Sequence, residues 1–354
     1  MRSAKIVGVG SFAPPKVLTN KDLEKMVNTS NEWIMERTGI KERHIADDKT
    51  AASDIGLEAA RRALKDARVK PEELDLIIVA TITSDMLFPS TACLIQDRLG
   101  AKKAAAFDLK AACSGFIYGL SVARGFIASG EYDTILVIAS EVLSKITDWE
   151  DRATCILFGD GAGAVVLKPT KKGQGILSTY LRADGGNWNL LWVPAGGSRI
   201  PTTRDSIDKK LHYMKMEGNR VFKIAVQSMT AAAIEGLKRA EVRIKDLSLL
   251  IAHQANLRII NAVAKRLSLP PEKVFINLDR YGNTSAASIP LALDEAVKRG
   301  RIKRGDLVIL VAFGGGFTWA SSVIRWERIS LKSYLARFGH RLTSLTTRHQ
   351  STDK

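Results

Sequence analysis

Two stretches of this chain, ELDLIIVA at residues 73–80 and DLSLLIAH at residues 246–253, follow one pattern. In each, a polar start leads into a continuous run of aliphatic residues, which is typical of a strand buried on both faces of an α/β sheet. The two stretches lie about 170 residues apart. A similarity at this spacing indicates that one α/β unit occurs twice in the chain.

The residues that follow each stretch repeat the same order of elements. About 30 residues downstream, each half has a second expected strand, at 107–109 and at 276–278, and then a turn of small residues that opens a helix. The two helices end near Gly130 and Gly300, and a third strand follows each of them. The sequence therefore predicts an α/β protein built from two duplicated halves.

The join between the halves is expected in the charged stretch 168–173, so that the halves comprise residues 1–172 and 173–326. Residues 327–354 form an additional basic tail. The remaining expected elements are strands at 76–79, 134–138, 249–251 and 307–310 and helices at 55–67 and 115–129. Ligands of α/β sheets bind in crevices at the strand ends, so residues at equivalent strand ends should meet near a pseudo-two-fold axis.

The chain has 354 residues, 45% of them hydrophobic and 25% charged, which is a globular composition with room for two domains. No apolar run reaches the ~18–20 residues of a membrane helix, and the N-terminus lacks the pattern of a secretory signal. The cysteines, Cys93, Cys113 and Cys155, form no CxxC pair. This usage favours a reducing, cytoplasmic compartment and argues against disulfides and a zinc site.

The charge balance indicates an acidic partner, because 53 lysines and arginines exceed 37 acidic residues and give a formal net charge of +16. Nucleic acid is disfavoured as that partner, since the sequence has no zinc-finger spacing, no RNA-recognition aromatic signature and no basic low-complexity arm. The tail carries a net charge of +4. Most of the excess therefore belongs to the body of the protein.

Cys113 is a candidate nucleophile, because it follows an expected strand and immediately precedes the helix at 115–129. A thiol at a helix N-terminus lies near unpaired backbone amides, which lower its pKa and favour the thiolate. Small neighbours permit a sharp turn of the nucleophile-elbow type. The alternative for a lone cysteine is a buried apolar residue, and this alternative is favoured for Cys93 and Cys155.

Two further polar residues occupy equivalent junctions. His253 ends an apolar strand, with a helix expected to start at 254–256, and Asn283 lies in the turn YGNTS at 281–285. Each has a simpler reading, His253 as a hydrogen-bonded core histidine and Asn283 as a turn or N-cap residue. The duplication puts both, with Cys113, at strand-to-helix junctions of related units, which points to a common site.

Two glycine-rich stretches resemble phosphate loops only superficially. FGDGAGA at 158–164 leads into a strand, so it lacks the helix that a dinucleotide fingerprint requires. GGG at 314–316 joins two expected strands, 307–313 and 319–326. Its backbone amides can approach a substrate oxygen and form an oxyanion hole; the alternative is a tight hairpin or bulge.

Three motifs together resemble the signatures of β-ketoacyl-acyl-carrier-protein synthase III: DLKAACSGF at 108–116, HQANLR at 253–258 and GNTSAAS at 282–288. The similarity extends from Lys5 to about Trp326, and the three motifs in this order are highly specific. The resemblance implies a thiolase-like fold, with two duplicated α/β halves in a five-layer αβαβα arrangement, and a homodimer.

The chemistry implied by the resemblance is the initiating condensation of type II fatty-acid synthesis. A short primer acyl-CoA, with acetyl-CoA favoured, condenses with malonyl-acyl carrier protein and releases CO₂ and CoA. Cys113 would carry the primer, with the amides of Cys113 and Gly315 as the oxyanion hole. His253 and Asn283 would hold the malonyl thioester oxygen as the enolate forms. Coenzyme A thioesters are substrates here, and no metal or other cofactor is implied.

The stretch TSNEWIMERTGI at 29–40 also matches the family. The implied CoA-binding residues are Thr29, Trp33, Arg37, Arg152, Met216, Gly218, Asn219, Phe222 and Asn256. Trp and Arg planes suit the adenine ring, and Arg suits phosphate. Without the resemblance, Trp33 would be read as the core residue of an amphipathic helix, and residues 216–222 as core packing.

Two further sites concern the primer and the carrier protein. Phe88, in MLFPS at 86–90, matches a family position that reaches across the dimer interface and closes the primer pocket. The excess positive charge suits an acidic carrier protein, and Lys223, Arg258, Lys265 and Arg266 are the candidate docking residues. The alternative for these four is a solvated helix face.

The tail departs from the family, which usually ends near Trp326. Leucines and one phenylalanine recur there at helical spacing, which suits a basic amphipathic helix or a disordered extension. Two other functions remain open for the whole chain. One is a thiolase-fold acyltransferase or condensing enzyme of secondary metabolism with another primer. The other is a catalytically silent partner subunit, which the intact Cys113, His253 and Asn283 disfavour.

Overall fold

The computed structural model describes residues 2–327, in which two main sheets carry the fold. The strand orders are β1-β7-β6-β4-β5 and β11-β12-β13-β8. The first sheet contains β1 (Arg2–Phe12), β4 (Leu76–Ala80), β5 (Ala105–Leu109), β6 (Ile135–Glu141) and β7 (Gly161–Lys171). The second contains β8 (Gly175–Ala183), β11 (Leu249–Ala252), β12 (Leu307–Gly314) and β13 (Thr318–Arg325). Two short pairs are β2 (Lys16–Thr19) with β3 (Glu42–Ile45), and β9 (Leu191–Trp192) with β10 (Lys215–Met216).

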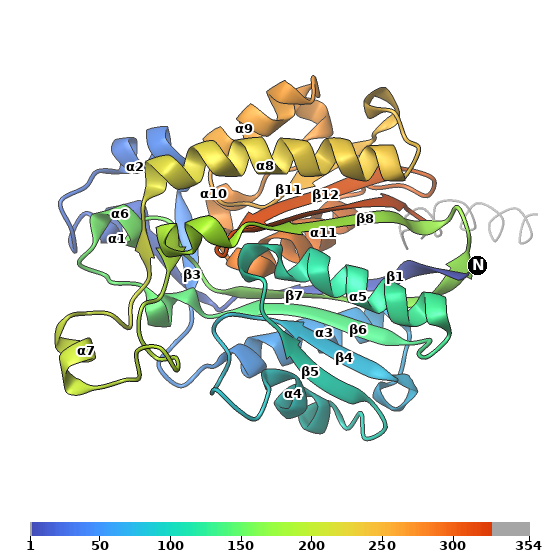
Figure 1. The fold of residues 1–354 in the computed structure, drawn as a ribbon, viewed down its shortest axis with the longest axis horizontal. Helices are drawn as coiled ribbons and strands as arrows, with labels where there is room; N and C mark the ends of the chain where they lie inside the picture. The colour runs from blue at the N-terminus through green and yellow to red at the C-terminus, as the bar shows by residue number, and fades with distance from the viewer. Residues whose placement is uncertain (1, 328–354) are drawn as a thin grey trace, which may run out of the picture.

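Helices cover the outer faces of both sheets and fill the space between them (Figure 1). α3 (Ala52–Ala67) and α4 (Thr91–Leu99) cover the first sheet, and α8 (Gly218–Arg239) and α9 (Leu257–Arg266) cover the second. α5 (Gly115–Ser129) and α11 (Ser288–Lys298) lie between the sheets. The short helices are α1 (Asn20–Leu23), α2 (Asn31–Thr38), α6 (Arg152–Cys155), α7 (Arg204–Asp208) and α10 (Leu278–Tyr281). This αβαβα order confirms the predicted fold class.

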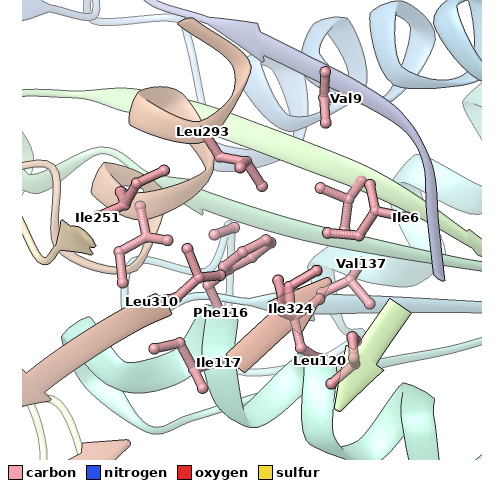
Figure 2. Packing of buried hydrophobic residues seen from close by; sticks show 14 of the residues in the cluster. Ile6, Val9, Phe116, Ile117, Leu120, Val137, Ile251, Leu293, Leu310 and Ile324 are labelled. Carbon is pink, nitrogen blue, oxygen red and sulfur yellow. The ribbon is translucent and has the colours of Figure 1, made fainter. Parts of the chain in front are cut away.

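The central core forms where the two middle helices meet both sheets. Phe116 of α5 packs in one cluster with Val137 of β6 from the first sheet and with Leu310 of β12 from the second (Figure 2). β4 and β6 are buried along their whole length, as the continuous apolar runs predict. Burial of apolar surface on both faces, at about 25 cal/mol per Å², therefore holds the halves together.

The duplication is visible in the backbone around the two middle helices. A 3₁₀ turn, Ala112–Ser114, precedes α5, and a second one, Ser285–Ala287, precedes α11. The first residue of each turn has a left-handed backbone, with φ of 43° at Ala112 and 49° at Ser285. Residues other than glycine rarely adopt this backbone conformation, which carries a conformational cost. The two turns are thus equivalent parts of the repeated unit.

One expected strand is wrong. Residues 276–278 do not pair as a strand; only an isolated bridge joins Val274 to Leu250 of β11. The reason is Gln254, a buried residue whose side-chain oxygen accepts hydrogen bonds from the amides of Asn277 and Leu278 at 3.0 and 3.3 Å. These amides are therefore unavailable to a neighbouring strand, and the chain turns into α10 instead.

Two smaller expectations also differ from the structure. The helix after His253 begins at Leu257 and not at 254–256, because the Asn256 side chain caps it by accepting from the Arg258 amide at 2.8 Å. Cys93 is exposed and not in the core, since α4 buries the face that carries Thr91, Ala92 and Ile95.

The expected join at 168–173 falls at the end of β7 and in the turn before β8. No helix within residues 2–327 is both long and apolar enough to cross a membrane. The expectations for the tail, from residue 328 onward, lie outside the described residues.

Candidate active site

A cavity of about 710 Å³ opens between the two halves. Its lining includes Cys113, His253, Asn283 and Gly315. They come from the turn before α5, the end of β11, the turn before α11 and the β12–β13 hairpin, respectively. The structure therefore brings together four residues that lie far apart in the sequence, and it does so at the strand ends where the duplication predicts a crevice.

The turn that carries Cys113 is fixed by the β12–β13 hairpin. The Thr318 hydroxyl donates to the Ala111 carbonyl at 2.9 Å, and the Ser114 hydroxyl donates to the Thr318 carbonyl at 3.1 Å. A Cβ on Gly314 would lie only 2.6 Å from the Cys113 amide nitrogen. Glycine is required there because the hairpin and the turn touch through their backbones. Cys113 and Gly315 consequently line the same cavity.

The ionisation of Cys113 differs from the sequence prediction. Its side chain is 8% exposed, and this burial raises the pKa of the thiol to about 12, with a further contribution from the nearby Glu141 carboxylate. A hydrogen bond from Ser285 acts in the opposite direction. The expected thiolate is therefore wrong for the resting site, because removal from water disfavours the charged form. The thiol is neutral until a base takes its proton.

His253 is held as a neutral imidazole at the end of β11. Burial lowers its pKa to about 3, so the ring carries no charge at neutral pH. Its Nδ1 lies 2.7 Å from the Ser288 hydroxyl, which also accepts from the Gln254 amide at 3.3 Å. If the Ser288 hydroxyl donates to Nδ1, the single ring proton lies on Nε2, where it is free to be donated.

Asn283 is positioned by its own backbone and by the turn that follows it. Its amide donates to the Leu157 carbonyl at 2.8 Å, and its carbonyl accepts from the Gly159 amide at 3.1 Å. The side-chain oxygen accepts from the Ser285 amide at 2.9 Å. This bond orients the side chain so that its Nδ2 is the end available to donate to a substrate oxygen.

One part of the cavity lining carries a tryptophan between two arginines. The guanidinium carbons of Arg37 and Arg152 lie 4.8 and 4.7 Å from the centroid of the Trp33 ring system. All three residues line the cavity, and Arg152 also donates to the Asn28 carbonyl. Asn256 lines it as well, but its side-chain amide donates to the Arg37 carbonyl at 2.9 Å. The cluster presents a flat, positively charged surface that suits an aromatic or phosphate group.

The other predicted residues fall into two groups. The following line the cavity: Met216, Gly218, Asn219, Phe222, Lys223 and Arg258. Arg258 is exposed, and its guanidinium lies 5.6 Å from the Phe222 ring centroid. The following are not part of the lining: Thr29, Phe88, Lys265 and Arg266. Lys265 and Arg266 lie in the last turn of α9, and Phe88 is 85% exposed.

Three polar residues beside the cavity were missed at the level of sequence: Glu141, Ser285 and Ser288. Ser285 and Ser288 belong to the quoted GNTSAAS motif, but the sequence shows no difference between them. Glu141 offered a clearer signal, because a carboxylate directly follows the apolar run ILVIAS, where the pattern predicts complete burial. A buried charge in a strand needs either partners or a function.

Two duplicated halves in an αβαβα arrangement around a shared cavity are the architecture of the thiolase-fold enzymes. Comparison with protein families agrees, since 3-oxoacyl-(acyl-carrier-protein) synthase III matches residues 107–185 and its C-terminal domain matches residues 237–326. The chain belongs to this family, also named β-ketoacyl-acyl-carrier-protein synthase III.

Individual relatives are similar over nearly their whole length. The β-ketoacyl-acyl-carrier-protein synthase III of Caldanaerobacter subterraneus subsp. tengcongensis is 58% identical over 92% of this chain and 98% of its own. The crystal structure of 3-oxoacyl-acyl-carrier-protein synthase III from Aquifex aeolicus is 51% identical, with a TM-score of 0.85 over 91% of this chain and 100% of its own. The priming β-ketosynthase of a polyketide pathway is 35% identical, with a TM-score of 0.86 over 92% and 97%.

Proposed function

We propose that the chain is the initiating condensing enzyme of type II fatty-acid synthesis. It joins a short primer acyl-CoA to malonyl-acyl carrier protein and releases CoA, CO₂ and a 3-ketoacyl thioester. The observation that carries the proposal is the placement of a thiol, a neutral imidazole and a carboxamide on one buried cavity. These groups supply a nucleophile and two uncharged hydrogen-bond donors, which are the groups that this condensation needs.

In the first half-reaction, Cys113 attacks the carbonyl carbon of the primer thioester and CoA leaves. The tetrahedral oxyanion accepts hydrogen bonds from the amides of Cys113 and Gly315, two residues of the cavity lining. Trp33, Arg37 and Arg152 bind the nucleotide end of CoA at their cation–π cluster. The apolar lining around Met216 and Phe222 accommodates the pantetheine arm.

In the second half-reaction, decarboxylation of the malonyl group forms an enolate. Nε2 of His253 and Nδ2 of Asn283 donate to its oxygen, and the enolate carbon attacks the acyl group on Cys113. A neutral imidazole can fill this role, because its one N–H donates a hydrogen bond to the oxygen on which negative charge develops. Substrate thioesters and protein side chains supply every group in these steps, so we expect no metal or redox cofactor.

We also propose that a homodimer in the cytoplasm is the active form. Met86, Leu87 and Phe88 are 45, 79 and 85% exposed in one chain, and such an apolar patch suits a protein interface. In a dimer, Phe88 of one subunit limits the primer pocket of the other to short acyl chains. Phe88→Thr should then increase the use of longer acyl-CoAs relative to acetyl-CoA.

A second candidate differs only in the primer. The similarity to a priming ketosynthase of polyketide synthesis favours it, because that protein shares the fold at 35% identity. Rates with a series of straight and branched acyl-CoAs distinguish the two candidates. A clear preference for acetyl-CoA supports fatty-acid initiation, and a preference for a longer or substituted primer supports the second candidate.

The half-reactions test the division of roles. His253→Ala and Asn283→Ala should each retain most of the acyl transfer from acetyl-CoA to Cys113 and lose decarboxylation of malonyl-acyl carrier protein by a factor of about 100–1,000, the usual effect of one oxyanion donor. Equal loss of both half-reactions in these variants would contradict the assignment.

A further inference from the structure

Glu141 is a buried acid for which neither half-reaction has a role. It ends β6 and is fully buried beside the cavity, and burial raises the pKa of its carboxyl to about 7. Isolated burial of a carboxylate is costly, so such a group is retained either with many partners or for a function. Its partners are therefore informative.

The two carboxylate oxygens of Glu141 have different neighbours. Oε2 accepts from the hydroxyls of Thr83 and Thr81 at 2.6 and 3.2 Å and from the Ile82 amide at 3.1 Å. These bonds hold the group in place from the loop after β4. Oε1 accepts from the Ser285 hydroxyl at 3.1 Å and, at 3.3 Å, from the Ile82 amide, which the two oxygens share. Only this second oxygen therefore faces the turn before α11.

Ser285 also contacts the nucleophile. Both residues line the same cavity, and the Ser285 side chain lowers the pKa of the Cys113 thiol, against the effect of burial. A serine hydroxyl can accept one proton as it donates another, so Ser285 Oγ, already bonded to Glu141 Oε1, is the group that can connect this acid to Cys113 Sγ. Ser285 has a left-handed backbone, with φ of 49°, which a residue other than glycine adopts at a conformational cost.

We propose that Glu141 accepts the proton of Cys113 through Ser285 during acyl transfer. This inference rests on the proposed role of Cys113 as the acyl carrier. As Sγ forms its bond to the primer carbonyl carbon, the thiol proton moves to Ser285 Oγ and the Ser285 proton moves to Glu141 Oε1. The bond between the acyl carbon and CoA then breaks, and CoA leaves as the thiolate. One negative charge on Glu141 is thereby exchanged for one on CoA, and Glu141 is neutral.

The same proton returns in the condensation step. When the enolate carbon attacks the acyl group, Cys113 is the leaving group, and Glu141 gives its proton back through Ser285. Charge repulsion supports the exchange, because the Glu141 carboxylate raises the pKa of Cys113 and the two groups do not readily carry negative charge together. His253 is a weaker base than Glu141, since burial lowers its pKa to about 3. Its Nδ1 is also already hydrogen-bonded to Ser288.

The elements packed around Glu141 offer few competing charges. Threonine hydroxyls face it from the loop after β4, Ser285 faces it from the turn before α11, and Cys113 is the titratable group coupled to it. On the neighbouring strand β7 its partner in the register is Gly161. The proton therefore has a defined path between the acid and the thiol.

The test compares acyl transfer in Glu141→Gln, Ser285→Ala and the double variant, with acetyl-CoA and rapid quenching. General-base catalysis contributes about 100-fold or more, so each single variant should lose about that factor, and the double variant should lose no more than about threefold beyond either. Asp160→Asn is the matched control: Asp160 is another buried acid with a serine donor, Ser144 at 2.6 Å, and it does not line the cavity. Its rate should stay within about threefold of the unchanged protein.

A second measurement, on the unchanged protein, gives a result that does not depend on whether the variants fold. Rapid-mixing infrared difference spectra, recorded as acylation proceeds at about pH 8.5, above the carboxyl pKa, should show a transient protonated carboxyl band, which Glu141→Gln abolishes. The inference is overturned if this band is missing, if Glu141→Gln acylates within about threefold of the unchanged protein, or if the losses multiply in the double variant. If the unchanged protein itself does not become acylated at Cys113, the proposed function fails instead.

Discussion

At Cys113 the chain places a buried thiol on a strained turn, opposite Gly314, where a Cβ would lie only 2.6 Å from the Cys113 amide nitrogen. Burial holds the thiol neutral, so its reactivity depends on how a substrate is delivered and not on its exposure. Cys93 is the opposite case, since it is exposed and unrelated to the cavity. The two thiols should therefore respond differently to a small reagent and to a substrate.

The first prediction concerns this difference. Brief treatment with iodoacetamide should modify Cys93 faster than Cys113, because alkylation requires an accessible thiolate. Acetyl-CoA should acylate Cys113 and leave Cys93 unmodified, because of these two only Cys113 shares a cavity with the tryptophan and arginines proposed to bind CoA. Peptide mass mapping after each treatment checks both results. Acylation of Cys93 or Cys155 with Cys113 unmodified would overturn the assignment.

The second prediction concerns pH and stability. The pKa of Glu141 is about 7 in the folded chain, against 4.5 for an ordinary glutamate, so the folded state binds more protons between these values. Its contribution to the free energy of unfolding is therefore fully present below the lower value and is lost as pH rises through about 7. The Glu141→Gln variant lacks this pH-dependent contribution to the free energy of unfolding.

The measurement is urea unfolding of both proteins at about pH 5 and about pH 8. The free energy of unfolding of Glu141→Gln, taken relative to the unchanged protein, should increase with pH by up to ~3 kcal/mol, at ~1.4 kcal/mol per pKa unit. The titration of His253, whose pKa is lowered, changes the free energy of unfolding with pH in the opposite direction. This contribution is present in both proteins and therefore cancels in the difference. A difference that does not change with pH would contradict a raised carboxyl pKa.

Among the elements, the contact between the β12–β13 hairpin and the turn before α5 positions the site most directly. The third prediction tests this contact by comparing the substitution of two glycines, Gly314 and Gly125. Gly314→Ala would put a Cβ 2.6 Å from the Cys113 amide nitrogen, so the turn must move. Acyl transfer should fall by about 100-fold, as for the loss of an oxyanion donor, and stability by ~1–3 kcal/mol.

Gly125→Ala is the control for this substitution. Gly125 lies within α5, and a Cβ there meets nothing within 4 Å. The change should raise stability by ~0.5–1 kcal/mol and leave acyl transfer unchanged, because alanine is the better helix former. Thermal unfolding and the acylation rate of both variants check the pair. Normal acylation in Gly314→Ala would show that the hairpin does not set the position of the nucleophile.

The elements also show how far the sequence alone could lead. The buried strands, the two middle helices and the repeat were predictable, because continuous apolar runs and small-residue turns are local signals. The strand expected at 276–278 failed because its amides bond to Gln254, a tertiary contact that no local pattern reveals. The neutral state of Cys113 was missed for a similar reason: a helix start is visible in the sequence, but the depth of burial is not.

Within the site, the same distinction holds. The motif resemblance led to Cys113, His253 and Asn283, which the structure places on one cavity. It did not lead to Ser285 or Glu141, because their significance lies in a chain of contacts between residues 144 positions apart. Thr29 lies outside the cavity lining, so a match to a family motif does not by itself establish a contact.

For the whole molecule, the net charge of +16 needs an explanation that the cavity alone does not supply. Lys223 and Arg258 line the cavity and are exposed, and Lys265 continues the same helix as Arg258. We expect this surface to attract an acidic carrier protein and so to raise the rate of encounter. Such attraction is screened beyond ~8 Å at physiological salt.

The fourth prediction follows from that surface. Arg258→Glu and Lys265→Glu should raise the apparent KM for malonyl-acyl carrier protein by roughly fivefold to tenfold at low salt, with a smaller effect at high salt. Acylation by acetyl-CoA should change much less in Lys265→Glu, which is outside the cavity lining. Lys303→Glu is the control, since it reverses an exposed charge just before the start of β12, whereas the cavity lies at the end of that strand. Equal effects of all three reversals would show that only net charge matters.

The most direct test of the account is the mass of the intact protein in two steps. Incubation with acetyl-CoA should add one acetyl group, located at Cys113, and release one equivalent of CoA. Addition of malonyl-acyl carrier protein should then remove that group and yield acetoacetyl-acyl carrier protein and CO₂ in equal amounts. An acetyl group on any other residue, or an acetylated Cys113 that malonyl-acyl carrier protein does not discharge, would contradict the account.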